Sequence, residues 1–192
     1  MSLNTIPFTK EIILKIVKDV SGKMIHIKKE VMEKYDIKFS NKNMSEILGK
    51  IMERSAADIF SEWLGHEVKF AKLDKEPDLY FTELKYPMEI KVTSTTNTWT
   101  GGEFSKRPFD YFLISWDPED YSKYFVCLTH LEKENWQSNI SKNFYGPSLK
   151  IKTLHDKEDK IIFLGRIVKT DRGAYKIQRE SINQQTFPRE KS

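Results

Sequence analysis

Two short β-type segments joined by a tight turn lie near the middle of the chain, and they constrain its fold most strongly. Leu79–Glu83 is rich in aromatic and apolar residues, Lys85–Pro87 is a plausible turn, and Met88–Thr95 alternates and carries β-branched residues. Successive side chains of a strand point to opposite faces, so the second segment has one apolar face and one face with Glu89 and Lys91. We therefore expect a hairpin that packs on a core through one face and presents charge on the other.

Three charged side chains of this hairpin suit the hydrolysis of phosphodiester bonds. Glu89 and Lys91 lie about 7 Å apart along one strand face, and Asp78, at the head of the first strand, can fold back to face Glu89. The two carboxylates offer the hard oxygen ligands that Mg²⁺ prefers, and the backbone carbonyl of Ile90 can supply a further one. Lys91 would hold the attacking water or stabilise charge in the transition state.

The order Pro77-Asp78, ten residues, then Glu89-Ile90-Lys91 resembles the PD-(D/E)XK signature of the restriction-endonuclease-like nuclease superfamily. In that family the Asp and the Glu bind Mg²⁺, with Mn²⁺ as a substitute, and the Lys assists the nucleophilic water. The resemblance covers residues 43–131 and implies an α/β (α+β) fold with a central mixed β-sheet flanked by helices. The alternative reading is an exposed hairpin in which Glu89 and Lys91 form a weak surface ion pair.

Length and composition fit one globular domain in a reducing compartment. The 192 residues are 39% hydrophobic and carry a net charge of +4, which permits a polyanionic partner without requiring one. Cys127 is the single cysteine, so an internal disulfide is impossible, and we expect a cytoplasmic protein with no membrane-spanning segment. We expect a single nuclease domain over residues 1–192, in which 1–42 form a helical accessory segment, 43–131 the core and 132–192 a strand and hairpin extension.

The N-terminal segment predicts two helices. Thr9 can cap a helix that runs to Val20 and ends at Ser21-Gly22, and Ile25–Tyr35 has the pattern of a second helix. The pair is either a helix-turn-helix-like module placed on DNA or, as the long connection favours, two helices packed on the main domain.

A strong helix follows, and it carries a candidate third acid. Asn43-Met44-Ser45-Glu46 has the form of a capping box, and Gly65 is a helix terminator. In the resembling family a helical acid ahead of the first strand often joins the metal site. Glu53, beside the apolar stripe of the helix, fits that place best, with Glu46 and Asp58 as rivals and a solvated carboxylate as the alternative for each.

The loop at residues 94–108 follows the lysine strand directly and should border the same cleft. Its Thr, Asn and Gly content disfavours a stable helix, whereas many members of the family have a full helix there. The loop is either an ordinary connection or a DNA-contacting element. In the second case the predicted DNA-binding residues are Thr96, Asn97, Trp99, Lys106 and Arg107.

The rest of the chain predicts further strands. We expect strands at Phe109–Trp116, Tyr124–Leu131 and Ile161–Val168, a short helix at Leu131–Asn139, a loop at 142–154, and a hairpin that ends with Ala174–Gln178. Basic residues outnumber acidic ones after position 142. They form either a second wall of a DNA channel or a solvated hairpin face, and they are Lys150, Lys152, Arg166, Lys169, Arg172, Lys176 and Arg179.

These observations predict a Mg²⁺-dependent DNA endonuclease most like a type II restriction enzyme. Such an enzyme acts on double-stranded DNA, commonly as a homodimer, because a two-fold protein matches a palindromic site. A structure-specific repair or recombination nuclease would use the same chemistry. A third possibility is a non-catalytic DNA-binding module in which the acidic pair is structural.

Overall fold

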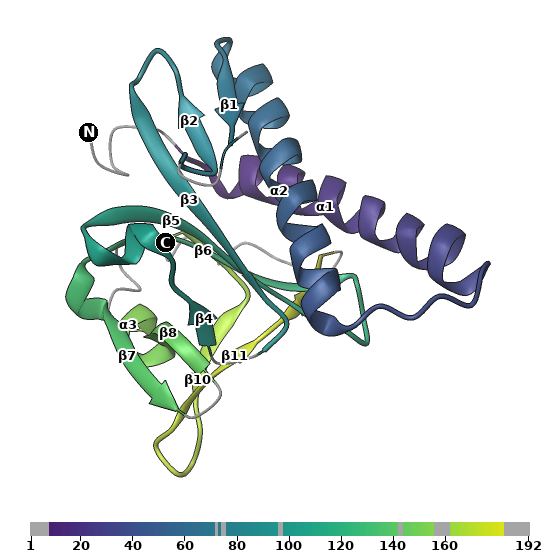
Figure 1. Cartoon of the computed structure of the whole chain (residues 1–192). Helices are drawn as coiled ribbons and strands as arrows, with labels where there is room; N and C mark the ends of the chain where they lie inside the picture. Colours follow the sequence, from purple (N-terminus) through teal and green to yellow (C-terminus); the bar gives the residue numbers. More distant parts are fainter. Residues whose placement is uncertain are drawn as a thin grey trace, which may run out of the picture.

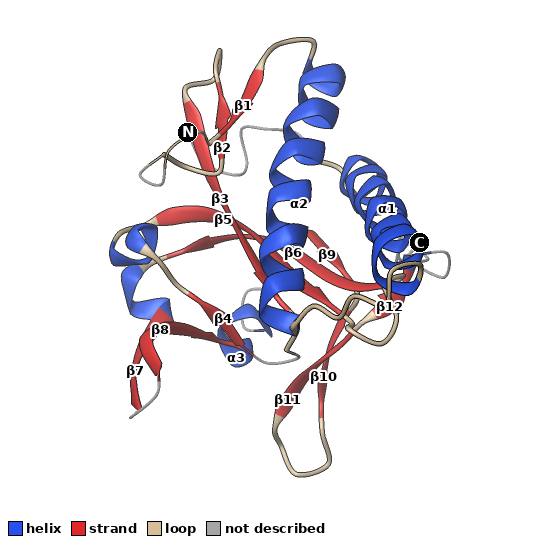
Figure 2. Cartoon of the chain, turned by 45° about the vertical axis from the view of Figure 1, so that its right-hand side comes forward, coloured by secondary structure: helices blue, strands red, loops and turns tan. Residues whose placement is uncertain are grey.

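A mixed β-sheet lies at the centre of the molecule, and two long helices cover one of its faces (Figure 1). The computed structural model describes residues 8–71, 73, 76–95, 98–141, 144–155 and 162–182. Helix α1 (Lys10–Ile27) packs against α2 (Asn41–Leu64), and α2 crosses strand β3 (Figure 2). The expected α/β class with a mixed central sheet flanked by helices is confirmed.

Within the described part of the chain, the central sheet has seven strands. Their order is β1-β2-β3-β5-β6-β12, and β9 pairs with β6 on the same edge as β12. Strands β3 and β5 are parallel and the other pairs are antiparallel, which makes the sheet mixed. The strands are β1 (Val68–Phe70), β2 (Leu79–Phe81), β3 (Tyr86–Thr93), β5 (Phe109–Trp116), β6 (Lys123–Leu131), β9 (Ile162–Leu164) and β12 (Glu180–Ser181).

Two smaller sheets accompany the central one. Strands β4 (Thr98–Thr100), β8 (Phe144–Lys150) and β7 (Trp136–Ser141) form one, and β10 (Arg166–Lys169) with β11 (Tyr175–Gln178) forms the other. The short helices are the π-helix η2 (Lys28–Glu33), the 3₁₀ turns η3 (Glu103–Lys106) and η4 (Lys133–Asn135), and α3 (Ile151–His155).

Each face of the central sheet covers its own core. Met88 and Ile90 of β3 point into the core under α1 and α2, together with Phe112 of β5. The opposite face of β5 and β6 packs Tyr111 and Cys127 against side chains from β4, β7, β8 and α3. Each fully buried large apolar side chain contributes ~1.5–3 kcal/mol. Because β3 alternates, Glu89 and Lys91 lie on the face away from the helices.

Helix α1 does not end where the sequence suggested. The predicted cap is present, since the Ile12 N–H donates to Thr9 Oγ1 at 3.3 Å. However, α1 continues through Ser21-Gly22 into η2, because Ser21 Oγ donates to the buried Tyr121 carbonyl at 2.9 Å and Met24 is fully buried. One helical rod replaces the two predicted helices, so the helix-turn-helix alternative is wrong.

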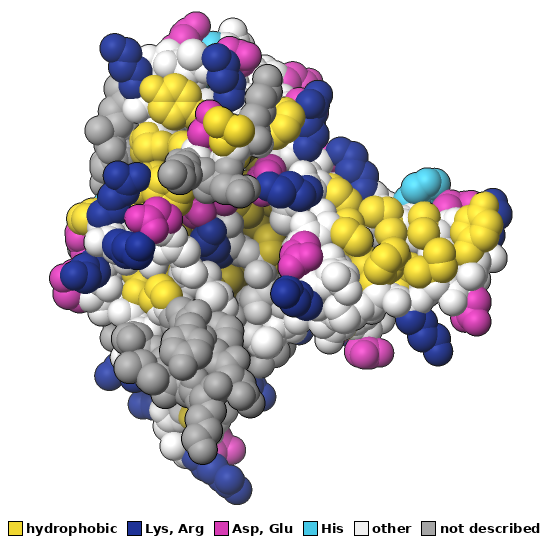
Figure 3. Space-filling view, in the orientation of Figure 1, with side chains coloured by type: hydrophobic (Ala, Val, Ile, Leu, Met, Phe, Trp, Pro, Cys, Tyr) yellow, Lys and Arg dark blue, Asp and Glu magenta, His cyan; other side chains and the backbone are white. Residues whose placement is uncertain are grey.

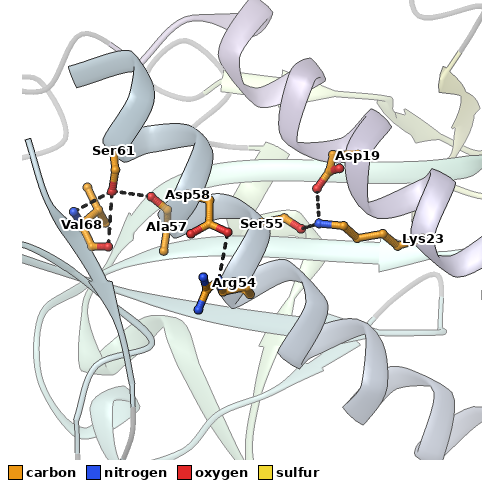
Figure 4. A network of polar contacts seen from close by, with 8 residues as sticks. All are labelled: Asp19, Lys23, Arg54, Ser55, Ala57, Asp58, Ser61 and Val68. Carbon is orange, nitrogen blue, oxygen red and sulfur yellow. Dashed lines mark hydrogen bonds and ion pairs between the residues drawn. The ribbon is translucent and has the colours of Figure 1, made fainter. Parts of the chain in front are cut away.

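The C-terminal half of helix α2 is held by hydrogen bonds to both α1 and β1. The helix begins after Ser40, three residues earlier than expected, and ends as predicted at Gly65, whose φ is 72°. Lys23 Nζ on α1 donates to Ser55 Oγ at 2.8 Å, while the Val68 N–H of β1 donates to Ser61 Oγ at 2.8 Å (Figure 4). Glu53 lies on the same helix close to the first of these contacts.

The hairpin and the following strands form close to the predicted positions. Strand β5 has the predicted bounds, and β6 begins one residue earlier than expected. Strand β3 begins two residues earlier, because the turn lies at residues 82–85 and uses Lys85 at a positive φ of 48°.

Three predictions for the C-terminal third are wrong. The expected helix Leu131–Asn139 is the 3₁₀ turn η4 followed by β7, and the expected loop at 142–154 contains β8 and α3. The expected strand Ile161–Val168 is interrupted at Gly165, whose φ of 100° ends β9 and starts β10. The predicted hairpin with Ala174–Gln178 is present as β10 and β11.

An arm formed by the end of α1, η2 and the start of α2 stands out from the body of the molecule (Figure 3). Apolar side chains gather on it, and Tyr35 and Ile37 are 64% and 41% exposed. Among the described residues, no helix combines the length and the apolar character that crossing a bilayer requires.

Candidate active site

The pairing of β2 with β3 brings Asp78 beside Glu89. Strand β2 begins at Leu79, which pairs with Met88 of β3. Among the described residues, the edge of β3 that faces β2 therefore has no strand partner from Glu89 onward. Asp78 fills this gap: its Oδ2 accepts a hydrogen bond from the Ile90 N–H at 2.8 Å. The aspartate therefore points toward β3, as the chain order suggested.

Glu89 is a buried carboxylate held by one ammonium group. It is 5% exposed, and Lys91 Nζ donates a short hydrogen bond to its Oε1. Burial raises the pKa of the Glu89 carboxyl to about 7; the Lys91 ammonium opposes this shift and the Asp78 carboxylate adds to it. Among the described residues, Glu89 Oε2 has no hydrogen-bond partner, so one buried oxygen is open to a ligand.

Glu53 of α2 reaches the same place from the helix side. Its side chain is 8% exposed and both of its oxygens accept from Lys50 Nζ at 2.8 Å. Burial raises the pKa of Glu53, the Lys50 hydrogen bond lowers it, and the Asp78 carboxylate raises it further. This effect of Asp78, and a smaller one of Lys91, shows that Glu53 senses the charges of the hairpin.

The two rival acids lie elsewhere. Glu46 is 63% exposed and 3.9 Å from Lys42, and Asp58 is 58% exposed and bonded to Arg54 at 2.9 Å. Neither is among the causes that shift the pKa of Glu89, whereas the charges of Asp78 and Lys91 both act on the pKa of Glu53. Of the three candidates, Glu53 is the acid that the fold brings to the hairpin.

Tyr111 of β5 is a site residue that sequence reasoning missed. It pairs in register with Glu89 on the parallel neighbour strand, is fully buried, and has no hydrogen-bond partner for its hydroxyl among the described residues. Burial raises the pKa of this phenol and the Glu89 carboxylate raises it further. Two buried polar atoms without partners therefore lie on adjacent strands of one sheet face.

The loop after β3 borders the site, as expected. Gly102 lies against Lys91: a Cβ on this glycine would stand 3.9 Å from Lys91 Nζ. Lys106 is exposed and paired with Glu103 at 2.6 Å, and the exposed Arg107 guanidinium stacks on Phe104 at 5.1 Å. Thr96 and Asn97 lie outside the described residues.

Two of the proposed DNA contacts are corrected by the structure. Trp99 is fully buried in the second core, and its Nε1 donates to the Ile114 carbonyl at 2.9 Å, so its ring is not available to stack on a base. Arg179 points inward as well: its Nε donates to Ser115 Oγ at 2.9 Å and its Nη2 to the Ser94 carbonyl at 2.6 Å. Both residues stabilise the fold.

The donor set fits a hard divalent cation. Within the described ranges no group of three or more His, Cys, Asp or Glu is already arranged as a metal cage. Mg²⁺ does not need such a cage, because it is usually bound through one or two carboxylates and keeps several waters. Asp78 and Glu89 offer two such carboxylates, Glu89 Oε2 has no hydrogen-bond partner in the part of the chain that the structure describes, and carboxylate oxygens favour Mg²⁺ or Mn²⁺.

Comparison with the models of known protein families and with curated protein sequences gives no match to this chain.

Proposed function

We propose that the protein is a Mg²⁺-dependent DNA endonuclease of the PD-(D/E)XK type, most like a type II restriction enzyme. The observation that carries the proposal is the arrangement of Asp78, Glu89 and Lys91, with Glu53 added from α2. An accidental surface pair would not be expected to bury Glu89 to 5% exposure and leave one of its oxygens without a partner.

The side chains have distinct roles in this proposal. Asp78 and Glu89 hold the cation, with the Ile90 carbonyl and Glu53 as further oxygen ligands. When bound, Mg²⁺ would lower the pKa of a water ligand and neutralise negative charge on the phosphate. Lys91, released from Glu89 Oε1, orients the attacking water and stabilises the charge that develops on the phosphate. Asp78 also keeps the β3 backbone in place through the Ile90 N–H.

The proposed substrate is double-stranded DNA in the cytoplasm. The net charge of +4, together with the exposed Lys106 and Arg107 in the loop beside Lys91, favours a phosphate backbone close to the site. We expect a homodimer, because cutting both strands at a two-fold site needs two centres related by the same symmetry. Mass measurement in solution, with and without DNA, tests this part of the proposal.

Cleavage of plasmid or phage DNA by the purified chain in Mg²⁺ or Mn²⁺ is the direct test. Discrete bands that disappear in Lys91→Ala and Glu89→Gln, but persist in Lys42→Ala, would support the proposal. Lys42 is a suitable control, because its side chain is 84% exposed and contacts Glu46 only at 3.9 Å. Failure of the wild-type chain to cut any DNA with either cation would contradict it.

The same experiment separates the two alternatives. Cleavage that follows forks, junctions or ends and ignores sequence would identify a repair or recombination nuclease. The Lys91–Glu89 ion pair is also the arrangement that a purely structural pair would adopt. A non-catalytic DNA-binding module would therefore bind DNA with the same affinity and melt at the same temperature with and without Mg²⁺.

A further inference from the structure

Lys50 is a second ammonium group at the candidate site, and no part of the proposed mechanism uses it. It precedes Glu53 by three residues on α2, so the two side chains lie on the same helix face. Its Nζ lies 2.8 Å from each oxygen of Glu53. The Lys50 side chain is 74% exposed and that of Glu53 is 8% exposed, so the ammonium covers a buried carboxylate from the solvent side.

Lys50 and Lys91 make the same kind of contact in the site. Each ammonium group contacts one buried acid, Glu53 in the first case and Glu89 in the second. With Asp78, the three carboxylates and two ammonium groups carry a formal charge of −1 when all three acids are ionised. A divalent cation that binds these carboxylates must therefore compete with both ammonium groups, since like charges a few ångströms apart repel each other.

We infer that Lys50 is a DNA phosphate-binding residue that Glu53 retains until a divalent cation takes its place. The inference rests on the proposed function and adds to it a contact with the DNA backbone that depends on the cation. Lys50 suits this role because lysine is a compact charge on a flexible four-carbon stem and binds phosphate as a point charge. Because its side chain is 74% exposed, Lys50 can turn from Glu53 toward a phosphate on the solvent side.

The affinity of the full chain for Mn²⁺ alone, measured by titration calorimetry without DNA, tests the competition. Lys50→Met removes the competing ammonium, so we expect Mn²⁺ to bind about twofold to fivefold more tightly, the worth of an ion pair of this kind. Lys42→Met is the matched control, because Lys42 lies on the same helix and forms an exposed, longer ion pair. It should bind Mn²⁺ as the wild type does.

The salt dependence of DNA binding tests the phosphate contact. A fluorescent duplex is titrated with wild type and with Lys50→Met, in Ca²⁺ and in a chelator, and the DNA is checked to be intact. In Ca²⁺ the logarithmic salt slope of Lys50→Met should be smaller by about one, the loss of one phosphate contact. In the chelator the two proteins should bind equally, because Glu53 then holds the ammonium.

The outcomes separate this inference from the proposed function. Equal salt slopes of the two proteins in Ca²⁺, or an unchanged Mn²⁺ affinity of Lys50→Met, would overturn the role of Lys50. The nuclease proposal would still stand if Mn²⁺ binding by the wild type depended on Glu89. A wild-type chain that bound neither Mn²⁺ nor DNA would overturn both. Lys50→Met leaves the buried Glu53 carboxylate with one donor fewer, so a lower melting temperature is expected, and a cooperative transition well above the assay temperature shows that the variant is folded.

Discussion

Glu89 and Tyr111 lie side by side on the parallel strands β3 and β5, and each has a buried polar atom without a hydrogen-bond partner among the described residues. An unsatisfied buried polar group costs stability, and such groups are tolerated where a ligand or an ordered water completes them. The edge of β3 beyond its pairing with β2 carries the Asp78 carboxylate, which accepts from the Ile90 N–H next to Glu89. The fold thus places two of its buried, unsatisfied polar atoms next to each other, beside the proposed cation site.

Removing the Tyr111 hydroxyl should stabilise the chain. Tyr111→Phe keeps the ring in the second core and removes a hydroxyl that lost its water on folding, so we expect a gain of ~1 kcal/mol in the free energy of unfolding. Denaturant unfolding in a chelator measures it. A loss of stability would show that the hydroxyl has a partner, such as a buried water.

Tyr86→Phe is the matched substitution with the opposite expected sign. Tyr86 Oη donates a 2.6 Å hydrogen bond to the buried carboxylate of Asp110, which also contacts His130 Nδ1 at 2.7 Å. The phenylalanine leaves a buried charge with one donor fewer, so we expect a loss of ~1–3 kcal/mol in the same assay. Equal effects of the two substitutions would refute the assignment of partners to these phenols.

Glu89→Gln should change how stability depends on pH. The pKa of Glu89 is about 7 in the fold, against 4.5 for an ordinary glutamate, so the folded state binds an extra proton between these values. Wild-type stability therefore falls as pH rises through this window, by up to ~3 kcal/mol, and the variant lacks this loss. Unfolding in a chelator at about pH 5 and pH 8 measures it, and parallel profiles would contradict the assignment.

Added Mg²⁺ or Mn²⁺ should stabilise the wild-type chain by binding to the folded state. At tenfold its dissociation constant, a cation adds ~1.4 kcal/mol, which removal with a chelator reverses. Asp78→Asn should abolish most of this gain, because an amide is a weaker cation ligand than a carboxylate. The Ile90 N–H keeps a hydrogen-bond acceptor in Asp78→Asn, so the substitution should change the stability of the cation-free protein less than it changes the gain from the cation. A full response in Asp78→Asn would place the cation elsewhere.

Local patterns predicted the hairpin and its charged face well, because alternation in β3 and the termination of α2 at Gly65 depend on neighbouring residues alone. Glu53 was identified for a similar reason, since its place beside the apolar stripe follows from helix periodicity. The i,i+3 spacing of Lys50 and Glu53 also indicates, from the sequence alone, that the two side chains share one helix face.

Tertiary contacts decided what local patterns could not. Ser21-Gly22 continues a helix because a carbonyl from Tyr121, a hundred residues later in the chain, accepts the serine hydroxyl. Trp99 looked like a loop aromatic, but its indole is buried because the Ile114 carbonyl accepts its N–H. The place of Tyr111 beside Glu89 depends on a parallel strand register, which no short motif encodes.

The inward-facing Arg179 has a consequence for the order in which the chain can fold. Its guanidinium joins the Ser94 carbonyl, just past β3, to Ser115 of β5, although the ribosome adds it long after both strands. A nascent chain that has already exposed Asp78, Glu89 and Lys91 still lacks this cross-link. The hydrogen bonds that join the end of β3 to β5 through Arg179 can therefore form only after most of the chain has been synthesised.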